Sequence, residues 1–214
     1  MKTQATFLLA TSCLVSQFAL ADTYTAEVWA DNWFQFNVNG NKVAEDSVSI
    51  TTERSFNAER FSFEAQTPFT IGLIAKDFKE NNTGLEYIGS RKQQMGDGGV
   101  IAQIRDSNNN IVVVTDSDWR CLVVHNAPSD KRCEKEDNPS AGEGYCQFPE
   151  IPMPADWDKS DFDDSGWISA QIYSESTVRP KGGYDRINWS SDAKLIWGDD
   201  LETNNTILCR KTVY

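Results

Sequence analysis

Most of the chain after residue 21 alternates between apolar and polar side chains, which is the pattern of a β-strand with one buried face. The alternation is clear over residues 24–29, 33–38 and 60–65. Residues 69–75 are continuously apolar, which indicates a strand in the interior of a sheet. Asn39-Gly40-Asn41 follows the second of these segments and predicts a tight turn, because Asn and Gly accept positive φ at little cost.

The same pattern continues to the end of the chain. Residues 100–105 and 111–115 flank the polar run 106–110 and predict a β-hairpin. Further strands are predicted over residues 119–125, 167–173, 193–197 and 206–213. No window has the 3.6-residue period of a long amphipathic helix, so the predicted class is all-β, an antiparallel β-sandwich.

Residues 126–166 interrupt this regularity with a long loop. The segment contains Cys133, Cys146 and most of the prolines, and it has little periodicity. A loop of this length inside a compact domain is usually functional or held by crosslinks.

The first 21 residues have the features of a cleavable export signal. Lys2 precedes a short apolar stretch, and the small-x-small triplet Ala19-Leu20-Ala21 predicts cleavage before Asp22. A lipoprotein signal ending at Cys13 is the alternative, but the usual aliphatic residue is absent ahead of it. We therefore expect one exported domain, residues 22–214, in the periplasm or secreted, without membrane insertion.

Net charge limits the classes of partner, and the cysteine count predicts disulfides. The chain has 20 Lys and Arg against 32 Asp and Glu, a net charge of −12, which argues against nucleic-acid binding and is compatible with divalent cations or neutral sugars. Four cysteines follow the signal, and an even number in an exported protein predicts two disulfides with three possible connectivities. The preferred pairs are Cys121 with Cys209 and Cys133 with Cys146.

Two short motifs resemble one superfamily. The run Ala30-Asp31-Asn32-Trp33 to Val38-Asn39-Gly40 resembles the "A-D-N, strand, V-N-G" hairpin of galactose-binding-like jelly rolls, and Phe162-Asp163-Asp164-Ser165-Gly166-Trp167 resembles their "F-D-D-S-x-W" turn. The resemblance implies a jelly-roll sandwich with the second motif placing a Trp against the core. Such domains often bind carbohydrate at loops or on a concave face, and many hold a structural calcium ion.

The residues themselves suggest three groups of candidates for a site. Aromatic rings beside polar side chains can stack on a sugar while their neighbours bond its hydroxyls, which favours Trp33 with Asp31 and Asn32, and Trp189 with Arg186. The polar, glycine-rich segment 76–99 is the most unusual part of the chain, and it either binds a ligand or simply turns the backbone. Its candidate ligand contacts are Asp77, Glu80, Asn82, Glu86, Arg91 and Asp97.

Acidic loops form the third group. Asp158, Asp161, Asp163 and Asp164 lie close in sequence, as do three acids within residues 199–202, and clustered carboxylates can supply the oxygen ligands of calcium. The spacing differs from that of an EF-hand loop, and a solvated turn explains both clusters equally well.

Catalysis has the weaker support. His125 is the only histidine, no G-x-S-x-G elbow is present, and no glycine motif for a nucleotide phosphate opens a helix. A glycoside hydrolase needs only two carboxylates, which the sequence alone does not single out. We therefore expect an exported, non-catalytic ligand-binding module, most simply a carbohydrate binder. The alternatives are a glycan-acting hydrolase with an unrecognised carboxylate pair, or a structural or interaction protein of the cell envelope.

Overall fold

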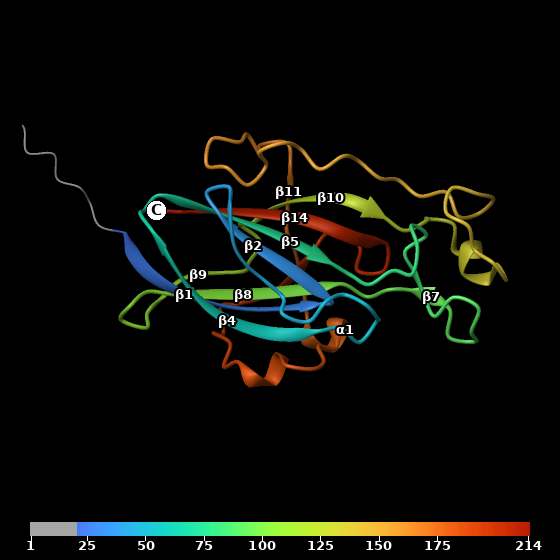
Figure 1. Cartoon of the computed structure of the whole chain (residues 1–214), viewed down its shortest axis with the longest axis horizontal. Helices are drawn as coiled ribbons and strands as arrows, with labels where there is room; N and C mark the ends of the chain where they lie inside the picture. Colours follow the sequence, from blue (N-terminus) through green and yellow to red (C-terminus); the bar gives the residue numbers. More distant parts are fainter. Residues whose placement is uncertain (1–20) are drawn as a thin grey trace, which may run out of the picture.

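The computed structural model describes residues 21–214, which form two antiparallel sheets packed face to face (Figure 1). The first sheet has the strand order β12-β13-β8-β1-β4, with β9 paired to β8, and the second has the order β11-β10-β14-β5-β2-β3. The strands of the first sheet are β1 (Asp22–Asp31), β4 (Asn57–Ala65), β8 (Gly99–Arg105), β9 (Ile111–Val114), β12 (Gln171–Tyr173) and β13 (Leu195–Trp197). The strands of the second are β2 (Trp33–Val38), β3 (Asn41–Glu45), β5 (Phe69–Lys76), β10 (Arg120–Asn126), β11 (Ile168–Ser169) and β14 (Asn204–Val213).

The core lies between the two sheets because one face of each strand is apolar. Ala26, Val28 and Ala30 of β1 point into it, as do Ile71 and Leu73 of β5. The predicted all-β antiparallel sandwich is confirmed. The predicted signal peptide lies outside the described residues, apart from Ala21.

Segments outside the sheets cover both outer faces of the sandwich. The first sheet is covered by residues 174–193, which contain α1 (Glu175–Val178) and the 3₁₀ turn η2 (Tyr184–Arg186), and here Trp29 packs edge-on against Tyr184 with ring centroids 5.5 Å apart. The second sheet is covered by Trp157 and Trp167, whose rings stack at 6.2 Å over Ile74. Trp167 thus packs on the sheet directly after the F-D-D-S-G-W turn, in which Asp163 accepts a hydrogen bond from the backbone N–H of Ser165.

A buried guanidinium holds this second cover in place. Arg210 of β14 donates to Asp164 at 2.8 Å and to the backbone carbonyls of Trp157, Lys159 and Phe162. A buried cation without these partners would be costly, so the segment and the arginine depend on each other.

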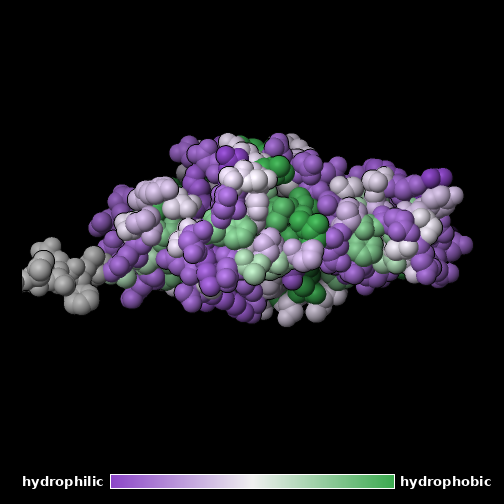
Figure 2. Space-filling view, turned by 90° about the horizontal axis from the view of Figure 1, so that it is seen from above, coloured by the Kyte–Doolittle hydropathy of each residue, from purple (hydrophilic) through white to green (hydrophobic). Residues whose placement is uncertain are grey.

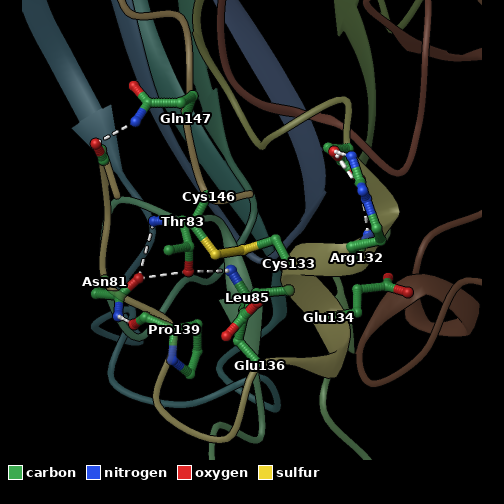
Figure 3. Close-up of a disulfide and its surroundings, with 12 residues drawn as sticks. Asn81, Thr83, Leu85, Arg132, Cys133, Glu134, Glu136, Pro139, Cys146 and Gln147 are labelled. Carbon is green, nitrogen blue, oxygen red and sulfur yellow. Dashed lines mark hydrogen bonds and ion pairs between the residues drawn. A yellow bond between two sulfur atoms is a disulfide. The ribbon is translucent and has the colours of Figure 1, made fainter. Parts of the chain in front are cut away.

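Both predicted disulfides are present. Cys121–Cys209 joins directly opposed residues of β10 and β14, with Cα atoms 4.1 Å apart. Cys133–Cys146 closes the long loop around the 3₁₀ turn η1 (Lys131–Lys135), as Figure 3 shows. It packs with Leu85 and Met95 of the short strands β6 (Leu85–Glu86) and β7 (Gln94–Met95), so loop and hairpin form a satellite cluster beyond the end of the sandwich.

Several elements differ from the expected ones. The strand predicted over 167–173 is split into β11 and β12, which belong to different sheets, because the N–H of Ala170 bonds the carbonyl of Trp119. Strands β3, β6 and β7 and the short helical turns were not predicted; they are too short to show a period. Within residues 21–214, no helix has the length and apolar character needed to cross a membrane.

Replacing Arg210 by Met should destabilise the protein by about 3 kcal/mol, because Asp164 and three carbonyls lose a buried donor. The measurement is urea unfolding at pH 7. Arg120→Met is the matched control, since exposed Arg120 pairs opposite Arg210 in the ladder and should shift stability by no more than about 0.5 kcal/mol. Equal losses in the two variants would contradict the role assigned to Arg210.

Candidate functional site

Four carboxyl groups meet where strands end at one end of the sandwich. Asp31 is the last residue of β1, Asp77 follows β5, Glu86 ends β6, and Asp97 lies two residues after β7. Each of these four was a sequence-based candidate, and the pairing of the sheets brings them within electrostatic reach of one another. We call them the carboxylate cluster.

One cation faces the cluster. Lys181, in the loop after α1, places its Nζ 3.6 Å from Asp31 Oδ2 and 3.6 Å from Asp97 Oδ1. The loop is held by a side chain of β1, since Trp29 Nε1 donates to the carbonyl of Gly182 at 3.1 Å. Asp31 and Asp77 are almost completely buried, at 1% and 3% exposure, whereas the side chain of Asp97 is 31% exposed and forms the rim.

Burial and mutual repulsion keep the cluster from being fully ionised. Burial raises the pKa of Asp31 to about 7, although Lys181 opposes the shift, and burial with the charge of Asp97 raises the pKa of Glu86 to about 7. The pKa of Asp77 is raised well above its ordinary value by burial and by the charges of Glu86 and Asp31. Carboxyl groups with such shifts in one place are a common sign of a functional site.

Local packing fixes Asp77 in particular. A Cβ atom on Gly96 would lie 1.7 Å from Asp77 Oδ2, so only glycine lets the chain pass beside this carboxyl group. Oδ1 of Asp77 and Oδ2 of Asp31 are buried without a hydrogen-bond partner. Gly96 is therefore needed for the close approach of the backbone to this carboxyl group, a role that differs from both interpretations of the glycine-rich segment.

A groove of about 660 Å³ opens beside the cluster, on the outer side of the second sheet. Its walls are the ends of β5 and β10, the start of β14, and residues 150–153 of the long loop. The apolar lining residues are Ile50, Phe78, Val124, Ile151, Pro152 and Met153. The polar lining residues are Lys76, Asp77, Lys79, His125, Glu150, Asn205 and Thr206.

The exposed lining of the groove is partly apolar. Ile151 and Met153 are 45% and 44% exposed. Figure 2 shows the face that is uppermost in Figure 1, where hydrophobic side chains gather near the middle and hydrophilic ones surround them. An opening of this size with mixed lining is typical of a site for a small ligand.

His125 belongs to the groove and was not expected to be there. Its Nε2 lies 3.1 Å from the carbonyl of Asn82, its ring packs against Phe148, and its Nδ1 is buried without a partner. Burial, with the neighbouring charge of Lys79, lowers the pKa of His125, so the ring is neutral at pH 7 and Nδ1 is an acceptor.

The other sequence-based candidates lie in different places. Asn32 is buried and structural, donating to the carbonyl of Glu53 and accepting from the N–H of Phe78. Trp33 is half-buried beside Lys76, whose Nζ is 4.8 Å from the ring centroid. Trp189 is half-buried and packs on Tyr184, on the first sheet.

The remaining polar candidates are exposed and are not joined into one site. Glu80 accepts from the N–H of Ile88, and Asn82 contributes only its carbonyl, to His125. Arg91 and Arg186 are exposed on separate segments. The structure thus brings the predicted residues Asp31, Asp77, Glu86 and Asp97 together, whereas Arg186 and Trp189 lie on the outer face of the first sheet, and ligand binding by any of them stays a prediction.

The predicted calcium site at Asp158, Asp161, Asp163 and Asp164 is not supported. Asp158 accepts from Asn37, Asp163 caps the turn at Ser165, and Asp164 is bound to Arg210. In residues 21–214 no three His, Cys, Asp or Glu side chains are arranged to hold a metal ion. Proximity in sequence did not predict a shared site, because Asp158, Asp163 and Asp164 bond three different partners.

Sequence reasoning also missed Lys181 and the wall formed by residues 150–153. Lys181 stood in a segment chosen for its aromatic and amide residues, and no sequence signal pairs it with Asp31. The sequence signal available for this wall was a run in which Ile151 and Met153 alternate with two prolines, since prolines do not continue a strand and leave such side chains exposed.

Replacing Glu86 by Gln should stabilise the protein at high pH but not at low pH. The raised folded-state pKa means that the native protein keeps a proton here up to about pH 7 that the unfolded chain releases near pH 4.5. The wild-type protein therefore loses this stability as pH rises from about 4.5 to about 7, and the amide does not. The stability of Glu86→Gln relative to wild type should rise by about 1–3 kcal/mol between pH 4 and pH 8, measured by urea unfolding.

Glu64→Gln on the exposed face of β4 is the control and should give a pH-independent difference. A flat difference for Glu86→Gln as well would show that Glu86 has the same pKa in the folded and unfolded states, and would contradict the raised value.

Comparison with known proteins gives no further guide, since no protein-family model, no curated protein and no solved structure matches this chain.

Proposed function

We propose that this protein is an exported, non-catalytic module that binds a carbohydrate in the groove between the end of β5 and residues 150–153. The observation that carries the proposal is the groove itself: about 660 Å³, with an apolar side and several hydrogen-bonding groups. A sugar ring has the same two characters, an apolar face and a rim of hydroxyls. Phe78 and Ile151 offer surface to the face, and exposed Glu150 and half-buried Lys79 offer partners for the hydroxyls.

Three further features support the proposal. The two disulfides are typical of proteins that mature outside the reducing cytoplasm. The N-terminal pattern predicts export. The hairpin and turn motifs resemble those of galactose-binding-like jelly rolls, and such domains often bind carbohydrate; this last argument rests on likeness of fold motifs alone.

The test is a glycan-array screen of oxidised residues 22–214, followed by calorimetry with the best ligand. Ile151→Ala should weaken binding about fivefold to tenfold, because it removes apolar contact area from the groove wall. Ile172→Ala is the matched control, since Ile172 is similarly exposed, at 49%, but lies on β12 of the other sheet. A folded protein that binds no glycan, or a ligand whose affinity is unchanged in Ile151→Ala and Met153→Ala, would overturn the proposal and favour an interaction role in the envelope.

A glycan-acting hydrolase is the second candidate, and the carboxylate cluster favours it. Because Lys181 Nζ is 3.6 Å from both Asp31 Oδ2 and Asp97 Oδ1, those oxygens lie within about 7 Å of each other, and glycosidase carboxyl groups stand about 5–10 Å apart. A carboxyl group with a pKa near 7, as burial gives Asp31, suits a general acid. This function ranks second because Asp31 is buried beneath Lys181, whereas the groove is open.

Under this second function, Asp31→Asn and Asp97→Asn should each lower kcat on a chromogenic aryl glycoside by about a hundredfold or more. Glu64→Gln should leave kcat unchanged. Absence of turnover by the wild-type protein across a panel of α- and β-glycosides would remove this candidate.

A further inference from the structure

Two lysines line the groove without an ion-pair partner. Lys76 is the last residue of β5, and Lys79 follows three residues later. Within residues 21–214, neither ammonium group lies within 4.0 Å of a carboxylate oxygen. In a chain of net charge −12, two cations left unpaired in the main opening are a distinctive feature.

The groups that face these lysines leave a net positive charge. Glu150 is the one carboxylate of the groove wall that interacts with Lys79. Burial and the neighbouring carboxylates raise the pKa of Asp77 well above its ordinary value, which disfavours its charged form, and His125 is neutral because its pKa is lowered. Lys76 lies over the ring of Trp33, which orients the ammonium group without neutralising it. The groove thus places two ammonium groups beside one ordinary carboxylate, Glu150, and one carboxyl group, Asp77, whose ionisation is disfavoured.

This arrangement is costly in the absence of a ligand. Lys79 is half-buried, and its pKa is lowered by burial and by the charge of Lys76. An anionic group bound between the two lysines would offset both effects, since a charge-assisted hydrogen bond is stronger than a neutral one. Because one side of the groove is apolar, the anionic group should belong to a molecule that also has an apolar face.

We propose that the groove selects an acidic saccharide, whose carboxylate is bound by Lys76 and Lys79 while its sugar ring packs against Phe78 and Ile151. This inference rests on the proposed function and narrows it to one class of ligand. It also refines the expectation from net charge: the chain as a whole repels polyanions, but this groove is locally positive.

The experiment compares two ligands that differ only at C6: the α-1,4-linked trimer of galacturonic acid and the α-1,4-linked trimer of galactose. A second pair, 3′-sialyllactose and lactose, samples a different acidic sugar. Calorimetry in 50 mM and 300 mM NaCl is expected to show at least tenfold tighter binding of the acidic member of at least one pair, and weaker binding of that member at the higher salt.

Lys79→Gln and Lys76→Gln should each lower affinity for the acidic member about tenfold and leave the neutral member unchanged. Lys92→Gln is the matched control, because Lys92 is exposed and also lies over an aromatic ring, that of Tyr87 at 5.8 Å, but is outside the groove. Thermal melting confirms that each variant is folded.

The outcomes separate the two proposals. If the neutral members bind as tightly as the acidic ones or more tightly, the groove does not select an acidic sugar, but carbohydrate binding stands. The same conclusion follows if Lys79→Gln and Lys92→Gln lose equal affinity for the acidic member. If the acidic members do not bind but other glycans on the array do, the same conclusion holds. If no glycan binds the folded protein, both proposals fall.

Discussion

The structure depends on one strand that is buried on both faces. All seven residues of β5 from Phe69 to Ala75 are buried, and all but Thr70 are apolar. Its inward side chains pack against the first sheet, and its outward side chains need a separate cover, which Trp157 and Trp167 provide. Arg210, from the neighbouring β14, binds that cover by its backbone carbonyls, so the cover is held by polar contacts as well as by apolar packing.

The groove and the carboxylate cluster both follow from where this cover and this strand end. Beyond Ala75 this cover no longer lies over the outer face, and residues 76–79, three of them charged, line an opening instead. On the inner side Asp77 occupies the position that the alternation would give to another core residue, and it meets acids from β1 and β6 there. The two candidate sites are therefore opposite sides of the same few residues of backbone.

The long strands of the two sheets could be predicted from the sequence because they depend on local periodicity. The bounds of β2 agree with its predicted range, and the hairpin of β8 and β9 was expected from its polar turn. The cysteine count predicted two disulfides and left three connectivities open, and the preferred one is present. The short strands β6 and β7 were not predictable, because two residues show no period and their pairing depends on the satellite cluster. The site was predictable only in part: segment 76–99 was singled out by composition, but the approach of Lys181 to Asp31 depends on a loop about 150 residues later in the chain. The bond between Asp164 and Arg210 was not predictable for the same reason, since Arg210 is remote in sequence.

The position of Cys121–Cys209 has a mechanical consequence. The bond joins directly opposed residues of β10 and β14 close to one end of their ladder, one pair inward from Arg120 and Arg210. A pulling force on β14 would first shear the hydrogen bonds between β14 and β10, but beyond Cys209 the load would pass through a covalent bond to β10. Most of the ladder lies on the groove side of the bond, where His125 and Thr206 pair, and it is thereby shielded from tension applied at the C-terminal end of β14.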